Sequence, residues 1–198
     1  INGLGGATSV TSKAAIIGVS KHPEADIDYT FAQISVDKPL VSYKGNCGNI
    51  SSAVGPFAVE RGLVKITEPI TTVRILNTNT GKIIEADVEV ENGSVKYEGD
   101  YTIAGVKVTG SPIRLKFVDP AGTISDRLLP TGNVVDELEV PGVGKVEVSI
   151  VDAANPLVFV KAESIGLKGT ELPADIDSDA GLLERIENVI GMAAVKLG

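Results

Sequence analysis

The sequence is poor in the residue types from which metal sites, disulfides and base-stacking surfaces are built. Its 198 residues include one cysteine, one histidine and no tryptophan, and aromatic residues make up 4% of the chain. A single cysteine cannot close an internal disulfide, and with a single histidine it cannot complete a structural zinc site. The scarcity of aromatic side chains also disfavours a surface that stacks nucleic-acid bases.

Long apolar runs and an excess of positive charge are also missing. No run reaches about 18 apolar residues, so we expect no membrane span, and no basic segment followed by an apolar run marks a secretory leader. The net charge of −8 disfavours a nucleic-acid partner. Together with the single cysteine, these features predict a cytoplasmic protein. An anionic ligand would need local cations and backbone dipoles to hold it.

The chain does contain enough apolar sequence, 43%, to build a core. Its 22 glycines and 10 prolines divide it into short segments rich in β-branched residues. Strands spaced by roughly ten residues predict a mainly antiparallel β architecture, and Asn92-Gly93 predicts a hairpin turn. The predicted strands cover residues 14–20, 29–34, 64–70, 72–77, 83–90, 95–97, 113–118, 145–151 and 157–161.

Two segments predict helices, which makes the fold class α+β, mainly β. Residues 50–61 are small and apolar, with Asn49 as the expected N-cap, and Gly55-Pro56 predicts that this helix is kinked or shorter. A helix that is apolar on most sides is buried, so we expect a sheet wrapped around it. Residues 180–196 carry apolar side chains at helical spacing. Each helix follows strands, which indicates two similar units.

The sharpest local feature is Gly45-Asn46-Cys47-Gly48-Asn49, directly before the first helix. A lone cysteine is commonly a small buried apolar residue, but the flanking Gly-Asn pairs are typical of a turn that a ligand can approach. A helix N-terminus favours a charged thiolate at Cys47 and attracts carboxylates. Cys47 is therefore a candidate nucleophile or proton-transfer group.

The glycine-rich start, residues 3–6, leads into Thr11, Ser12 and Lys13. A flexible surface turn is the simpler interpretation, and the spacing fits neither a phosphate loop nor a dinucleotide fingerprint. In the functional interpretation, Thr11, Ser12 and backbone amides bind a carboxylate. Lys13 directly precedes an apolar strand, so partial desolvation would favour its neutral form and make it a usable base.

Two further segments are weaker candidates. Residues 152–156, Asp-Ala-Ala-Asn-Pro, predict either a β-turn or a turn that presents the amide of Asn155 to a ligand. Asp175, Asp177 and Asp179 imitate the start of a calcium loop, but its required glycine and glutamate positions are not matched. A solvated acidic helix start explains them better, so no metal site is expected.

Several segments together resemble one family. In chain order they are residues 3–6, 11–13, 46–49, 51–56, 110–113, 119–122, 129–133, 152–156 and 158–160. On these segments the chain resembles the 2-methylaconitate cis–trans isomerase family, PrpF, which shares the diaminopimelate-epimerase-like fold. The resemblance implies two pseudo-symmetric domains, each a barrel-like sheet around a central helix, with the active site between them.

The resemblance also implies boundaries and a length. With the boundary that the sequence itself suggests near residues 142–151, it gives a first domain at residues 1–145 and the start of a second at 146–198. Family members are about twice as long, so the N-terminal part of the first domain and the C-terminal part of the second are expected to be missing. The chain would then hold about half a site and could be inactive alone.

The implied activity is a cofactor-independent isomerisation of a small unsaturated di- or tricarboxylate, in which a base removes an allylic proton. By resemblance, Lys13 is the principal base and Cys47 a second acid/base or polarising group. Asn46, Gly48 and Asn49 would form an anion-binding turn. Asn155, Thr11 and Ser12 would contact the substrate. Which group acts on which carbon stays open at this point.

Other functions remain open on the sequence. A related isomerase or tautomerase of itaconate or oxalomesaconate type belongs to the same class. A non-catalytic carboxylate-binding protein that assists an aconitase-like dehydratase belongs to a different class, and a truncated remnant without function is a third alternative. The expected partners are a small unsaturated carboxylate and, by function, such a dehydratase; a homodimer is left open, and neither nucleic acid nor membrane is expected.

Overall fold

The chain divides into two compact units, each with its own hydrophobic core. The computed structural model describes residues 8–198, and the units are Ile1–Pro120 and Ala121–Gly198. The sequence placed the division at 145/146, which lies inside the strand β9 (Gly144–Ala153). Each unit is described below by itself.

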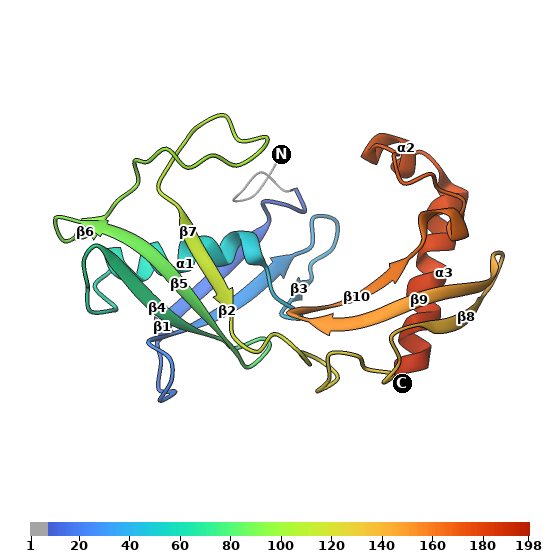
Figure 1. Ribbon diagram of the computed structural model, residues 1–198, viewed down its shortest axis with the longest axis horizontal. Helices are drawn as coiled ribbons and strands as arrows, with labels where there is room; N and C mark the ends of the chain where they lie inside the picture. Colours follow the sequence, from blue (N-terminus) through green and yellow to red (C-terminus); the bar gives the residue numbers. More distant parts are fainter. Residues whose placement is uncertain (1–7) are drawn as a thin grey trace. The chain divides into compact units, whose positions relative to one another are not determined.

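The first unit is built on a curled, mostly antiparallel sheet (Figure 1). The strand order is β1-β2-β4-β5-β6, with β3 beside β2 and β7 beside β5, and only the pairing of β2 with β4 is parallel among the described strands. Short connections between neighbouring strands explain the antiparallel pairing. The strands are β1 (Lys13–Val19), β2 (Ile27–Ile34), β3 (Val41–Ser42), β4 (Ile70–Asn77), β5 (Lys82–Glu91), β6 (Ser94–Val95) and β7 (Ile113–Phe117).

Alternation along the strands gives this sheet one apolar face. In β5, the buried side chains Ile84, Ala86 and Val88 alternate with the acidic side chains of Glu85 and Asp87. Because successive side chains of a strand point to opposite faces, the apolar set lines the core. The hairpin turn expected at Asn92-Gly93 is confirmed, since both residues have positive φ, 55° and 74°.

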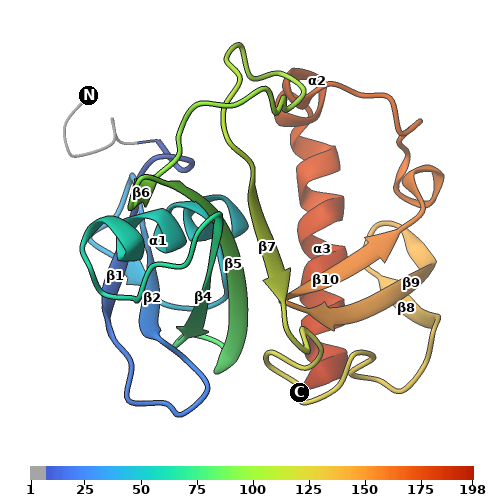
Figure 2. The same ribbon diagram turned by 60° about the vertical axis from the view of Figure 1, so that its left-hand side comes forward.

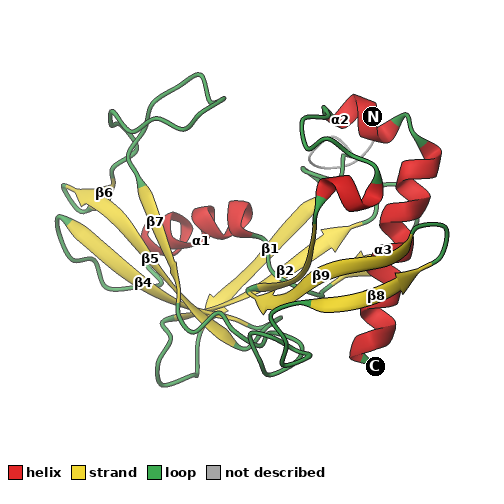
Figure 3. Ribbon diagram, turned by 45° about the vertical axis from the view of Figure 1, so that its right-hand side comes forward, coloured by secondary structure: helices red, strands yellow, loops and turns green. Residues whose placement is uncertain are grey.

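The helix α1 (Gly48–Glu60) lies against the apolar face of the sheet (Figure 3). It contacts β1, β4, β5, β6 and β7, and its buried residues join the core of the unit. Gly55 is required for this approach, because a Cβ there would lie 2.9 Å from the Cβ of Ala86. The sheet wrapped around a buried helix is confirmed.

The helix begins earlier than the sequence predicted. Its N-cap is Cys47 instead of Asn49, because the carbonyl of Cys47 already accepts a hydrogen bond of 3.0 Å from the N–H of Ser51. It also continues through Pro56, which is buried. A proline removes one hydrogen bond from a helix, and packing of α1 on the sheet offsets that loss.

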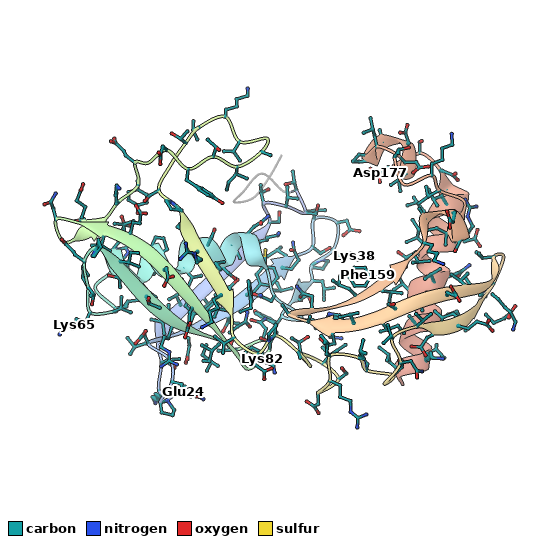
Figure 4. The ribbon with its side chains drawn as sticks, viewed as in Figure 1. Glu24, Lys38, Lys65, Lys82, Phe159 and Asp177 are labelled. Atoms are coloured by element: carbon teal, nitrogen blue, oxygen red, sulfur yellow. The ribbon has the colours of Figure 1, made fainter. Side chains whose placement is uncertain are left out.

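The prediction of a strand at residues 64–70 is wrong. Only Ile70 belongs to a strand, and the rest is an irregular segment, on which the exposed Lys65 is labelled in Figure 4. The apolar side chains Val64 and Ile66 pack against the core of the unit without joining the sheet. Burial therefore explains the apolar pattern that imitated a strand.

The second unit pairs a three-stranded antiparallel sheet with one long helix (Figure 2). The strand order is β10-β9-β8, with β8 (Asp136–Val140), β9 and β10 (Asn155–Val160). The helix α3 (Ala180–Leu197) packs against β8. Two short helical segments, η1 (Ala162–Ile165) and α2 (Pro173–Asp177), precede it.

The termini of the long helix follow the expected chemistry. The side chain of Asp179 caps α3 by accepting a 2.9 Å hydrogen bond from the N–H of Leu182. Val189 and Ala193 bury one side of α3 against the sheet.

In both units two neighbouring antiparallel strands precede the helix that packs on the sheet, β1–β2 before α1 and β9–β10 before α3. The mainly β, α+β class is confirmed.

No helix within residues 8–198 is both long enough and apolar enough to cross a membrane.

Candidate active site

The first strand directs Lys13 toward the start of α1. Lys13, Ala15 and Ile17 lie half-buried on the face of β1 that meets the helix, whereas the residues between them are exposed. Lys13 Nζ donates a hydrogen bond of 3.4 Å to Cys47 Sγ. Cys47 is the N-cap of α1 and is half-buried. The sheet and the helix thus bring together the two residues that the sequence singled out.

The turn before β1 is fixed by its own hydrogen bonds. The carbonyl of Thr8 accepts from the N–H groups of Thr11, at 3.2 Å, and of Ser12, at 2.8 Å. The Thr11 hydroxyl bonds to that of Thr8 at 2.5 Å, and Ser12 is buried. The candidate binding residues Thr11 and Ser12 therefore lead directly into Lys13. The glycines of residues 3–6 lie outside the described residues.

A buried amide holds Asn46, the residue before Cys47. Asn77, at the end of β4, is fully buried, and its Nδ2 donates a 2.8 Å hydrogen bond to Asn46 Oδ1. The Oδ1 of Asn77 in turn accepts from the N–H groups of Asn79, at 2.9 Å, and Thr80, at 3.2 Å. The orientation of Asn77 is therefore fixed, and with it the orientation of Asn46.

A buried hydroxyl supports the same turn. Ser51 is fully buried in the first turn of α1, and its Oγ donates to the carbonyl of Cys47 at 2.8 Å and lies 3.4 Å from Asn46 Oδ1. Ser51 and Asn77 were not predicted from the sequence as supporting residues. A signal was available for Asn77, since it occupies a core-facing position at the end of an alternating strand.

The N-terminus of α1 is suited to an anion. Gly48 and Asn49 are exposed in its first turn, which carries no acidic residue. Their N–H groups precede the first helical hydrogen bond, donated by Ser51, and such groups carry partial positive charge. A carboxylate is favoured at this position.

Asn155 lies in the second unit, at the start of β10, and is half-buried. The preceding Ala154 has a positive φ of 60° in the tight connection from β9. Asp152 is fully buried beside this connection and accepts hydrogen bonds from Thr123 and Ser125. Burial by itself raises the pKa of Asp152, but hydrogen bonds from the Thr123 hydroxyl and nearby backbone N–H groups outweigh it and lower that pKa to about 2. An ionised Asp152 thus fixes the turn that carries Asn155.

A cavity on the first unit is a poorer carboxylate site. It has a volume of about 330 Å³ and is lined by residues of β5, β7 and the connecting segment. Hydrogen bonds from Ser111 and Lys96 hold the pKa of Glu89 below its ordinary value, so this lining residue is ionised. A second lining carboxylate, Asp87, pairs with Arg114 at 3.9 Å. The lining residues are Ile70, Asp87, Glu89, Tyr101, Pro112, Ile113 and Arg114.

Across residues 8–198, no group of three or more histidine, cysteine, aspartate and glutamate side chains is placed to hold a metal ion.

The same segments that build this site match a known family. A family model described as PrpF protein matches residues 1–198. The chain belongs to the PrpF family. Two relatives support the assignment. A 3-methylitaconate isomerase from Eubacterium barkeri is 52% identical over the whole chain, which covers 52% of that protein. A 2-methyl-aconitate isomerase from Cupriavidus necator is 44% identical, and the chain covers 52% of it.

Solved structures place this PrpF chain in a known fold. A crystal structure of methylitaconate-delta-isomerase is 52% identical, with a TM-score of 0.80, over 100% of this chain and 51% of that one. A probable proline racemase from Agrobacterium radiobacter K84 is 18% identical, with a TM-score of 0.53, over 88% and 42%. The epimerase-like fold is confirmed. The chain spans about half the length of the curated relatives it matches.

Proposed function

We propose that the whole protein is a cofactor-independent isomerase of a small unsaturated di- or tricarboxylate, with Lys13 and Cys47 as its proton-transfer groups. The observation that carries this proposal is the 3.4 Å contact of Lys13 Nζ with Cys47 Sγ at the start of α1, in a chain of the PrpF family. An amine and a thiol that share a hydrogen bond can exchange protons with each other and with a bound substrate.

Substrate binding is assigned to the groups around these two side chains. A substrate carboxylate would accept hydrogen bonds from the N–H groups of Gly48 and Asn49, where the helix dipole also favours negative charge. Asn46 and the hydroxyls of Thr11 and Ser12 are the further candidates in this unit. Asn155 of the second unit is proposed as a substrate contact as well. These donors would also stabilise the negative charge that develops during the reaction.

The chemical step conserves protons and electrons. The base, Lys13, takes the proton from an allylic carbon, and the electron pair of the broken C–H bond moves into a dienolate that extends to the carboxylate. A proton then returns to the other end of the conjugated system, or to the same carbon after rotation. Cys47 serves as the second acid/base group. The product is an isomer of the substrate, so the reaction needs no oxidant or reductant.

The relatives' names indicate which acids to offer. One relative is named for 3-methylitaconate and is 52% identical, whereas one named for 2-methyl-aconitate is 44% identical. Both acids carry a carbon–carbon double bond next to carboxylates, which fits an anion-binding helix start beside a base. The higher identity makes 3-methylitaconate the first acid to test, with 2-methylaconitate and 4-oxalomesaconate after it.

The test is proton NMR in D2O on the full-length protein, with each acid offered separately. We expect deuterium to enter an allylic position of at least one acid. Lys13→Met and Cys47→Ser should each slow that exchange by at least about 100-fold, the range of a lost acid/base group. Lys21→Met, an exposed lysine in the loop after β1, is the matched control and should exchange like the wild type.

A folded protein that binds these acids without exchanging any of their protons would overturn the isomerase proposal. It would favour the non-catalytic carboxylate-binding role instead.

A further inference from the structure

Tyr29 carries a buried hydroxyl that the structure leaves without a partner. Its side chain is fully buried in the core of the first unit, and its Oη is the buried side-chain polar atom without a hydrogen bond among the described residues. Buried polar groups are almost always hydrogen-bonded, because an unpaired one costs free energy. The position of this hydroxyl therefore needs an explanation.

The register of the sheet places Tyr29 beneath the turn that carries Cys47. In β2, Tyr29 stands opposite Ile17 of β1 and opposite Asn77 of β4. Asn77 is the residue that holds Asn46, next to Cys47. Tyr29 and Asn77 are both fully buried on the face of the sheet that meets α1. Tyr29 is thus the neighbour of a residue that already supports the candidate site.

Cys47 packs against the core cluster that contains Tyr29, and the Ser51 hydroxyl bonds to the carbonyl of the same cysteine. Burial raises the pKa of the Tyr29 phenol, the Ser51 hydroxyl partly offsets this, and Cys47 raises it further. The phenol is therefore a neutral O–H donor close to Ser51 and Cys47. Ser51 already donates its own proton to the carbonyl of Cys47. The acceptors available to the phenol in this group are the Ser51 Oγ, which keeps its lone pairs, and the sulfur of Cys47, and a thiolate is the stronger acceptor of the two.

We propose that Tyr29 is a positioning residue for Cys47, whose buried hydroxyl donates a hydrogen bond to Cys47 Sγ when the sulfur is a thiolate. A thiolate accepts hydrogen bonds much more strongly than a thiol, so the phenol gains its partner when Cys47 gives up its proton to the solvent or to a bound base. Tyr29 then stabilises the charged sulfur from the core side, while Lys13 bonds it from β1.

The charged groups around Cys47 are few. Lys13 faces it from β1 and Tyr29 from β2, and Lys44, in the loop before it, is exposed. Ser94 and Val95 of β6 carry no charge, and the charged side chains of β4 and β7 lie on the outer face of the sheet. Those of β5 do so as well within the strand, except Lys82, which stands at a core-facing register position opposite Asn77 and pairs with Asp119 at 3.6 Å. A shift in the titration of Cys47 on changing Tyr29 can therefore be assigned to the lost phenol.

The experiment measures the alkylation of Cys47 by iodoacetamide in the full-length protein, as a function of pH, with the Cys47 peptide quantified by mass spectrometry. In Tyr29→Phe we expect the midpoint of this profile to rise by about one pH unit, the effect of one hydrogen bond to a charged group. The melting temperature should stay the same or rise, because the substitution removes an unpaired buried hydroxyl and keeps the ring.

The matched control is Tyr97→Phe. The Tyr97 hydroxyl donates a 2.5 Å hydrogen bond to Glu60, at the opposite end of α1 from Cys47. This variant loses a hydroxyl that is bonded to the same helix and should leave the alkylation midpoint unchanged. An unchanged midpoint in Tyr29→Phe as well would overturn the proposal and leave Tyr29 a packing residue.

The inference rests on the role of Cys47 in the proposed function, but its test does not require turnover. A raised midpoint in Tyr29→Phe supports it even where none of the acids exchanges protons, in which case the proposed function alone fails. The reverse outcome is also distinguishable. If the wild-type protein exchanges substrate protons but the alkylation midpoint of Cys47 does not change in Tyr29→Phe, the isomerase proposal stands and the role of Tyr29 is refuted.

Discussion

Lys13 Nζ and Cys47 Sγ lie 3.4 Å apart, although 34 positions separate the two residues in the chain. Strand alternation turns Lys13 toward the helix, and the first helical hydrogen bond places Cys47 at the N-cap of α1. Lys13 is the first residue of β1, and Cys47 ends the turn that leads into α1. The pair is therefore held by the sheet and the helix, which makes its geometry precise enough for proton transfer.

We predict that Lys13 and Cys47 act as a unit. If the two side chains share one proton-transfer step, removing either disables it, and removing both costs little more. The double variant Lys13→Met/Cys47→Ser should therefore exchange deuterium into substrate about as slowly as the slower single variant. Losses that multiply in the double variant would show that the two groups contribute independently.

The contact of Asn77 with Asn46 supplies a second prediction. Asn77→Asp keeps the oxygen that accepts from Asn79 and Thr80, but replaces the Nδ2 that donates to Asn46 by an oxygen. Two oxygens then face each other, and Asn46 must turn away. We expect proton exchange to fall about tenfold or more, which corresponds to about 1.4 kcal/mol, the order of one hydrogen bond.

Thr80→Ala is the control for this variant, because it leaves the contact between Asn77 and Asn46 intact. Its exchange rate should equal that of the wild type. An Asn77→Asp protein with full activity would mean that Asn46 does not need this orientation.

The parts of the site that the sequence could predict are those that local patterns encode. A glycine- and asparagine-rich turn before an apolar helix pointed to Cys47, and an apolar strand after a polar turn pointed to Lys13. The supporting residues Asn77, Ser51 and Tyr29 depend on strand register and helix placement. Register is a property of the folded sheet, so the neighbours of Tyr29 and Ser51 could not be inferred beforehand. For Asn77, alternation along β4 indicates a core-facing side chain but does not name Asn46 as its partner.

The same reasoning explains one of the strands that the sequence did not predict. β8 begins with Asp136, and aspartate is unfavourable in strands. In the structure Asp136 is buried, and it accepts hydrogen bonds from Thr131 at 2.5 Å and Asn133 at 2.9 Å and pairs with Lys196 at 3.3 Å. Hydrogen bonds from the preceding turn and the ion pair with the end of α3 offset the cost of burying the Asp136 carboxylate. None of these partner residues is adjacent to Asp136 in the sequence.

Asp152 gives a prediction for the dependence of stability on pH. Its pKa is about 2 in the folded protein, below the ordinary value of 3.8. A depressed carboxyl pKa stabilises the fold above the unfolded value, and this contribution is lost as the pH falls from about 4 to about 2. The difference corresponds to about 2 kcal/mol for this fully buried group. We expect the melting temperature of the full-length protein to fall more steeply over this range than that of Asp152→Asn.

Asp152→Asn is the matched variant because its amide can still accept from the N–H groups of Ile124 and Ser125 and donate to Thr123. It removes the charge and keeps the shape, so at pH 7 it should be less stable by about 2 kcal/mol. Hydrogen exchange of the Ile124 and Ser125 amides reports the same change locally. Equal melting curves for the two proteins between pH 2 and pH 4 would contradict the assigned pKa.

Gly55 gives the last prediction, which links the packing of α1 to the site. A Cβ at Gly55 would lie 2.9 Å from the Cβ of Ala86 and 3.0 Å from the Cγ2 of Val88. Alanine normally improves a helix by about 1 kcal/mol over glycine, but overpacking a core costs about 1 to 3 kcal/mol. Neither neighbour has a flexible end that could move aside. We expect Gly55→Ala to lower the free energy of unfolding by about 1 kcal/mol, measured by urea denaturation.

The substitution should also lower activity, because α1 must move away from β5 to admit the methyl group, and Cys47 is the N-cap of that helix. Gly18→Ala is the control, since a Cβ at Gly18 of β1 would contact no atom within 4 Å. That variant should keep both its stability, within about 0.5 kcal/mol, and its rate of proton exchange. If Gly55→Ala loses stability but keeps the full exchange rate, the placement of α1 on the sheet is not what sets the distance between Cys47 and Lys13.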